Sequence, residues 1–247
     1  MGGLIITSIG YAALFWVDGI TCFLAGLLLL QVLNPKKAKN SDEVKVKNPV
    51  SAYSDKAFWI FLIAMMLFGA TFLQYFSTMP LYYKDAHHLS ELEIGLLLGL
   101  NGLVIFLIEM PLVKWLDEGT YTKTGLVLFG AILTALSFIV LNLTSWAGIL
   151  VVGMLLMTIG EMIAFPFSNA FALERAKKGN QGEYMALYSI AFSFAHIFSH
   201  NTGMQLVSAL GFDTTWIIIT GVALLCALFL LMLKKMLVKE KIKLQNQ

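Results

Sequence analysis

The chain has 247 residues, of which 58% are apolar and 13% charged, with a mean hydropathy of +0.79 and a formal net charge of +2. This composition excludes an ordinary soluble domain. The basic residues are dispersed over short polar segments, which excludes a continuous nucleic-acid-binding face. Cys22 and Cys226 both lie inside apolar segments, so neither a disulfide framework nor a zinc cage is predicted.

Long apolar segments follow one another along almost the whole chain. A helix needs about 20 such residues to cross the hydrocarbon core of a bilayer. Only segments that satisfy their own backbone hydrogen bonds can span lipid, so an all-α membrane protein with seven transmembrane helices is predicted. In chain order the segments are residues 12–33, 58–82, 94–116, 124–142, 146–172, 184–208 and 214–233.

One connection is much longer than the others. Residues 34–56 are polar, rich in Lys and contain Pro35 and Pro49, which is typical of a flexible linker. The linker divides the chain into residues 1–33, a lone first helix, and residues 57–247, a six-helix block with a basic tail. Because the helix count is odd and a single helix precedes the linker, we expect the latter part of a longer protein.

The basic residues predict the orientation in the membrane. Of the 17 Lys and Arg residues, all but Lys84 belong to loops that the alternating spans place on one side. Cytoplasmic loops carry an excess of such residues. We therefore expect a bacterial inner-membrane protein with its C-terminus in the cytoplasm, and with Lys37, Lys114, Lys177 and Lys239 on the same side.

Polar side chains at membrane depth mark interior pathways by default, because they are costly against lipid. In the fifth segment, Thr158, Glu161 and Asn169 recur at helical spacing and share a face. Similar stripes on the second, third and sixth segments could enclose one polar cavity. The candidate substrate or coupling residues are Glu161, His196, Gln74, Asn101, Asn169, His200 and Glu109.

Each candidate also has a structural interpretation. Glu161 lies halfway along its segment and would suit a proton-binding or cation-binding group. His196 could titrate near physiological pH. The amides of Gln74, Asn101 and Asn169 could equally form hydrogen bonds between helices, while Glu109, nearer the cytoplasmic end, could extend toward the headgroups.

Catalytic and metal-binding motifs are missing from the sequence. His196 and His200 have a spacing that suits a metal, but Ile197 stands where a zinc protease has Glu, and no third ligand is evident. Neither a Gly-x-Ser-x-Gly elbow nor a phosphate-binding loop occurs. We therefore predict no enzyme, no cofactor and no metal site.

Several stretches resemble helices of the major facilitator superfamily. The similarity is to its sixth helix at Gly10–Cys22, its seventh at Gln74–Tyr83, its eighth at Ile94–Leu112, its tenth at Gly160–Phe171 and its eleventh at Gly182–Ala195. The resemblance implies helices six to twelve of a twelve-helix carrier. The six-helix block would then be half of that fold, built from two inverted three-helix repeats, 58–142 and 146–233.

The resemblance also implies a gating loop between the third and fourth segments. The family's Gly-x-x-x-Asp-Arg-x-Gly-Arg signature is in register here only at Asp117, while Lys123 lies off register. Asp117 and Lys123 are the candidate gating residues.

The implied function is secondary transport of a small solute, with proton-coupled efflux as its expected form. The expected partners are the solute, protons, the lipid bilayer and a missing N-terminal transporter half, with no nucleic acid. Two alternatives remain open: a noncatalytic membrane interaction or assembly protein, and a seven-helix receptor-like protein. Against the second, residues 214–233 contain no Lys for a Schiff base and no Asp-Arg-Tyr follows the third segment.

Overall fold

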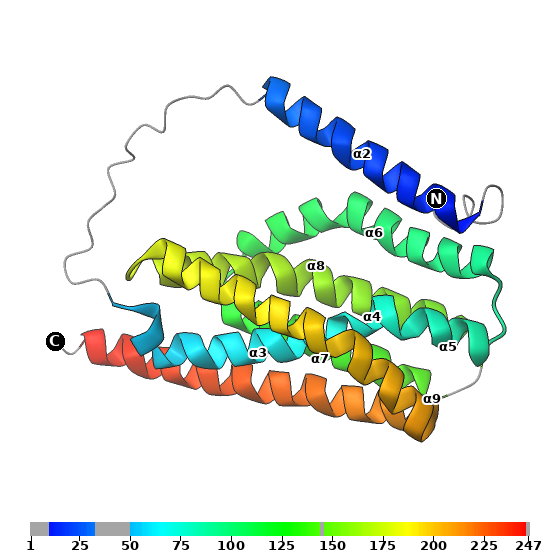
Figure 1. The fold of residues 1–247 in the computed structure, drawn as a ribbon. Coiled ribbons are helices and arrows are strands. Elements are labelled where there is room, and N and C mark those ends of the chain that lie inside the picture. Colours follow the sequence, from blue (N-terminus) through cyan, green and yellow to red (C-terminus); the bar gives the residue numbers. More distant parts are fainter. Residues whose placement is uncertain (1–9, 33–49, 144–145, 246–247) are drawn as a thin grey trace.

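The computed structural model describes residues 10–32, 50–143 and 146–245, and every regular element within them is helical (Figure 1). Six of these helices are long and apolar enough to cross a membrane. The predicted all-α, multi-pass class is therefore confirmed. The elements are α2 (Tyr11–Val32), η1 (Ala52–Ser54), α3 (Lys56–Phe72), α4 (Gln74–Ser77), α5 (Met79–Asp85), α6 (Glu91–Asp117), α7 (Lys123–Leu141), α8 (Gly148–Ala176) and α9 (Gln181–Gln245).

The last two predicted spans lie within the single element α9. Its backbone leaves the helical region at Gly211, where φ is 78° and ψ is 173°. Glycine adopts a positive φ without the steric penalty that a Cβ brings. Figure 1 shows the chain reversing direction at the end of the first arm of α9, so the second arm runs back along the bundle.

The segment predicted as one span at 58–82 is interrupted. It forms α3, α4 and α5 in succession, with breaks at Leu73 and Thr78. Pro80 in the first turn of α5 has no N–H to continue the hydrogen bonds of α4. The hydroxyl of Ser77 also donates to the carbonyl of Leu73 at 3.0 Å, and such bonds bend helices. The stretch still extends from Lys56 to Asp85 as one candidate span.

The core lies between α3, α7, α8 and α9, whereas α2 and α6 contribute little to it. Only Ile94, Asn101 and Leu116 of α6 are buried, and none of the apolar span in α2 is buried within the described residues. Two clusters of apolar side chains fill the space between these helices, and the second cluster also includes Tyr75 of α4 and Met79, Tyr82 and Tyr83 of α5.

Two glycines bring α7 and α8 into close contact. A Cβ added at Gly130 would lie 2.7 Å from the carbonyl oxygen of Gly160, and one added at Gly160 would lie 2.9 Å from the carbonyl oxygen of Gly130. Small residues at such crossings let helix backbones approach closely in membranes. The Gly130–Gly160 contact is therefore part of what holds the core together.

We expect Gly130→Ala to destabilise the protein by about 1–3 kcal/mol, because the new methyl group meets backbone that cannot move aside alone. Gly99→Ala on α6 is the matched control, since nothing lies within 4 Å of a Cβ at that position. Unfolding of the purified proteins in detergent, followed by circular dichroism, measures the difference. Equal stability of the two variants would contradict the close contact.

The end of the predicted linker is attached to the bundle. The amide of Val50 donates to the carbonyl of Lys178 at 3.0 Å, and Ala52 in η1 is fully buried. Ser51 donates to the carboxylate of Glu183 at 2.7 Å. Residues 1–9 and 33–49, which include most of the predicted linker 34–56, lie outside the described residues.

The orientation inferred from the basic residues is tested by single-cysteine labelling. Figure 1 shows that α6 begins and α8 ends at opposite ends of the bundle. His88 precedes α6 and Lys177 follows α8 in the chain. Cys22 is exposed, so both variants need a Cys22→Ser background, whereas Cys226 is buried. We expect an impermeant maleimide to label His88→Cys in intact cells, and Lys177→Cys only in everted vesicles. Labelling of both from the same side would contradict the topology.

Candidate functional site

A buried carboxylate lies at the middle of α8, where α6 crosses it. Glu161 is only 6% exposed. The side-chain amide of Asn101 in α6 donates one hydrogen bond to Oε1 of Glu161 at 3.0 Å and another to the hydroxyl of Thr158 at 2.8 Å. The Thr158 hydroxyl in turn donates to the carbonyl of Met154 at 2.7 Å. Two polar residues of α8 and one of α6 thus form a single buried cluster.

No basic side chain neutralises Glu161 in the part of the chain that the structure describes: none of its ion pairs includes this residue. The charged residue that acts on it electrostatically is another carboxylate, Glu109 of α6. A buried charge without a counter-ion is costly in a low-dielectric medium. The cluster is therefore chemically suited to hold a proton or a bound cation.

Gln74 belongs to a separate cluster that joins α4 to α9. Its amide nitrogen donates to the carbonyl of Ser199 at 2.8 Å and to the Ser199 hydroxyl at 2.9 Å. Its amide oxygen accepts from the hydroxyl of Thr78 at 2.6 Å. Because Gln74 is buried with both ends of its amide bonded, this geometry suits a connection between helices. Ser199 carried no sequence signal that would single it out among many Ser residues.

Three other candidates lie on exposed faces. His196 and His200 project from the first arm of α9, and Asn169 from α8, while Glu109 is half-buried. The structure does not bring His196 into hydrogen-bonded contact with the cluster around Glu161. Within the described residues, no group of three His, Cys, Asp or Glu side chains could hold a metal ion.

The two candidate gating residues have different surroundings. Asp117, the last residue of α6, is exposed. Lys123, the first residue of α7, forms an ion pair with Glu174 of α8 at 2.8 Å. Lys123 thus connects the loop to α8. Asp117 and Lys123, both described, do not form an ion pair with each other.

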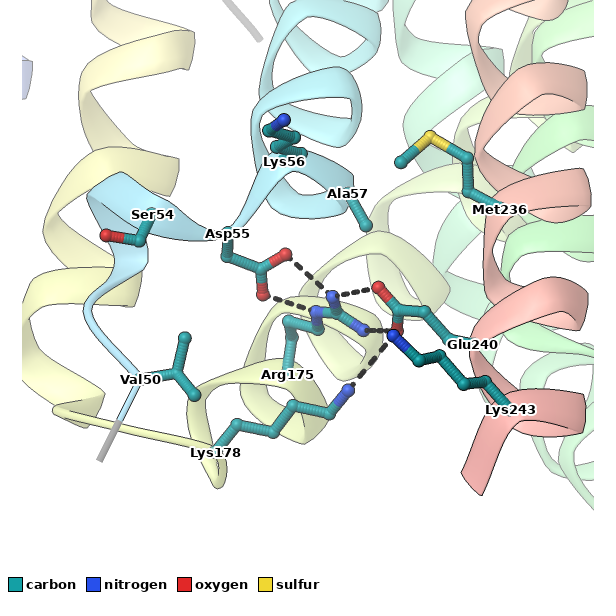
Figure 2. A pocket seen from close by; sticks show the side chains of 10 residues that line it. All are labelled: Val50, Ser54, Asp55, Lys56, Ala57, Arg175, Lys178, Met236, Glu240 and Lys243. Carbon is teal, nitrogen blue, oxygen red and sulfur yellow. Dashed lines mark hydrogen bonds and ion pairs between the residues drawn. The ribbon is translucent and has the colours of Figure 1, made fainter. Parts of the chain in front are cut away.

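The end of the bundle that carries the basic residues holds an ionic network that sequence reasoning missed (Figure 2). Arg175 of α8 binds Asp55, which caps α3, at 2.5 and 2.6 Å. The same guanidinium binds Glu240 in the second arm of α9 at 2.8 and 2.9 Å. Tyr184 donates a further bond to Asp55 at 3.0 Å. Three core helices are thus tied together by one arginine with two bidentate partners.

Burial and ion pairing have opposite effects on the pKa of the Asp55 carboxyl group. Burial alone would raise the pKa of its carboxyl group, because it disfavours the charged form. The hydrogen bonds and positive charge of Arg175, together with the Phe58 amide and the Tyr184 hydroxyl, outweigh burial and lower that pKa below its ordinary value. Asp55 is therefore ionised at neutral pH, as its role as a partner of Arg175 requires.

Comparisons with known proteins place this architecture among transporters. The family model described as Major Facilitator Superfamily matches residues 1–200. A protein of Planococcus maritimus named "Na(+), Li(+), K(+)/H(+) antiporter" is 25% identical over 195 residues. That alignment covers 73% of this chain and 45% of the relative, so the chain spans less than half the length of the relative it matches. No solved structure matches the chain.

Proposed function

Since the chain belongs to the major facilitator superfamily, we propose that it acts in secondary transport, exchanging protons for a small solute, with Glu161 as the group that carries the proton. The buried carboxylate of Glu161, hydrogen-bonded by the neutral amide of Asn101 and without a basic partner in the described chain, is the observation that carries this proposal. Such a group changes its charge at membrane depth when it gains or loses a proton.

The proposed solute is a monovalent cation. The relative from Planococcus maritimus is named as an antiporter of Na⁺, Li⁺ and K⁺ against H⁺. In this chain, the carboxylate of Glu161 and the hydroxyl oxygen of Thr158 lie within reach of the same Asn101 amide. Oxygen ligands suit such hard cations. A cation and a proton would therefore compete for one negative charge, which is the simplest basis for exchange.

The neighbouring residues position this carboxylate. Asn101 donates to Oε1 of Glu161 and to the Thr158 hydroxyl, and so keeps both on the face of α8 that meets α6. Glu109 adds a second negative charge that favours cation entry. His196 and His200 on the exposed face of α9 are proposed to line the route of the solute, where a further transporter half would face them.

The proposed arrangement follows the family's fold. The two arms of α9 would cross the membrane separately and give seven spans, with residues 58–142 and 146–233 as inverted repeats. Residues 57–247 would form one transporter half, residues 34–56 the central loop, and residues 1–33 the last helix of the other half. The basic residues favour a bacterial inner membrane and a cytoplasmic C-terminus.

Everted membrane vesicles test the function. Respiration acidifies their lumen, and a pH-sensitive dye reports the gradient. We expect addition of Na⁺, Li⁺ or K⁺ to dissipate part of the gradient in vesicles that contain the chain, and not in vesicles from cells without it. An unchanged gradient with all three cations, in vesicles where cysteine labelling shows that the chain is inserted, would contradict the proposal.

A further inference from the structure

A pocket of about 540 Å³ opens at the basic end of the bundle, between the start of α3, the end of α8 and the second arm of α9 (Figure 2). Its volume lies within the usual range of small-molecule sites. Four basic and two acidic side chains line it, an excess of two positive charges. The charged lining residues are Lys56, Arg175, Lys178, Lys243, Asp55 and Glu240.

Only some of the basic residues that line this pocket form ion pairs with acidic residues of the described chain. Arg175 is fully occupied by Asp55 and Glu240. Lys178 makes one longer contact with Glu240 at 3.4 Å. Lys56 and Lys243 line the pocket from two different helices, and neither forms an ion pair with any described residue. Two lysines therefore remain available to an anion from outside.

The residues around the pocket suit the depth of lipid headgroups. Lys56 is the first residue of a candidate membrane span. Tyr53 and Trp59 flank it, and both are exposed. The Trp59 ring nitrogen donates to the carbonyl of Tyr53 at 3.0 Å, which fixes the two aromatic residues at one level. Exposed Trp and Tyr side chains are typical of the membrane–water interface.

We propose that this pocket binds a phosphate-bearing anion at Lys178 and Lys243, with the headgroup of an anionic phospholipid as its favoured source. Lys56, whose side chain points away from these two in Figure 2, adds a further positive charge to the pocket lining. Basic pockets between transmembrane helices on the cytoplasmic side are suited to such headgroups. The site is independent of Glu161, and binding there does not depend on the proposed transport.

The test measures lipid binding to the purified 247-residue chain in neutral detergent by native mass spectrometry and by thermal unfolding. The probes are phosphatidylglycerol, phosphatidylcholine with the same acyl chains, and inorganic phosphate compared with chloride at equal ionic strength. The pocket variant is Lys56→Gln with Lys243→Gln. The control is Lys235→Gln with Lys241→Gln, which removes the same charge from exposed positions outside the pocket lining.

We expect phosphatidylglycerol to bind and stabilise the wild type more than phosphatidylcholine does. Binding should weaken about fivefold for each pocket lysine removed, while the control variant keeps its affinity. A lysine-dependent effect of inorganic phosphate, with no preference for phosphatidylglycerol, would support the anion site with a soluble ligand. Equal weakening in both double variants, or no preference for any anion, would overturn the proposal. Equal unfolding temperatures in phosphatidylcholine would show that both variants fold.

Discussion

Glu161→Gln is expected to abolish the cation-induced loss of the pH gradient in everted vesicles, down to the level of vesicles without the protein. Glutamine keeps the size of the side chain, and its amide oxygen can still accept the hydrogen bond from Asn101. It cannot carry a proton or a negative charge, so exchange through this position stops. The same variant should lose the cation-dependent change of the carboxylic acid signal in infrared difference spectra.

Glu118→Gln is the matched control for this experiment, because it makes the same chemical change at an exposed position at the end of α6. It should exchange like the wild type. If Glu161 served only as a hydrogen-bonding group between helices, its Gln variant would behave like this control. Wild-type exchange by Glu161→Gln would exclude the residue as the coupling group, and His196 would be the next position to test.

The second large effect is expected from Arg175→Met, which should destabilise the protein by about 3–5 kcal/mol. The substitution leaves the buried carboxylate of Asp55 without its counter-ion and releases Glu240 from α8. Arg175→Lys should also destabilise, because an ammonium group cannot make two bidentate contacts. Unfolding in detergent by denaturant, with Lys177→Gln at an exposed neighbouring position as control, measures both losses.

The double variant Asp55→Asn with Arg175→Met separates the effect of the ion pair from the loss of packing around Arg175. Asp55→Asn removes the charge that Arg175→Met leaves unpaired, so the two losses should be less than additive. Strict additivity would mean that Asp55 and Arg175 do not stabilise each other. A loss below about 1 kcal/mol for Arg175→Met would show that the network is dispensable.

Acid should weaken the same network. The pKa of Asp55 is lower in the folded protein than its ordinary value of 3.8. Its contribution to stability is therefore fully present above that ordinary value and is lost as the pH falls through the folded-state pKa. The wild type should lose stability in this acidic window, whereas Asp55→Asn should show a flatter profile.

The helical class and most span positions could be predicted because lipid imposes a simple rule: a spanning segment must be apolar and must satisfy its own backbone. The interruptions were harder to predict. Pro80 and Ser77 divide the second span into three helices, and hydropathy does not register such local backbone effects. Gly211, in contrast, lies between two predicted apolar segments, where a reversal of the chain was expected.

The candidate site could be predicted only in part. The carboxylate of Glu161 and the amide of Asn101 were each visible as polar groups in apolar segments, but only the structure gives their hydrogen bond. The ionic network was missed because Arg175 was counted with Lys177 and Lys178 among the basic residues of the loops, and its partners Asp55 and Glu240 lie in the predicted linker and basic tail. Arg175 is the single arginine of the chain, and that was the available signal.

Because few residues of α6 are buried, its hydrogen bond to α8 is an important part of what holds the helix in place. Asn101 is one of only three buried residues of that helix, and the polar one among them. A hydrogen bond to an ionised carboxylate is stronger than one to a neutral acid. If Glu161 carries the proton as proposed, we expect protonation to weaken this hydrogen bond between α6 and α8, and ionisation to strengthen it. The proposed charge change on one side chain would thus act on a loosely packed helix through the 3.0 Å hydrogen bond to Glu161, while the bond from Asn101 to Thr158 does not depend on that charge.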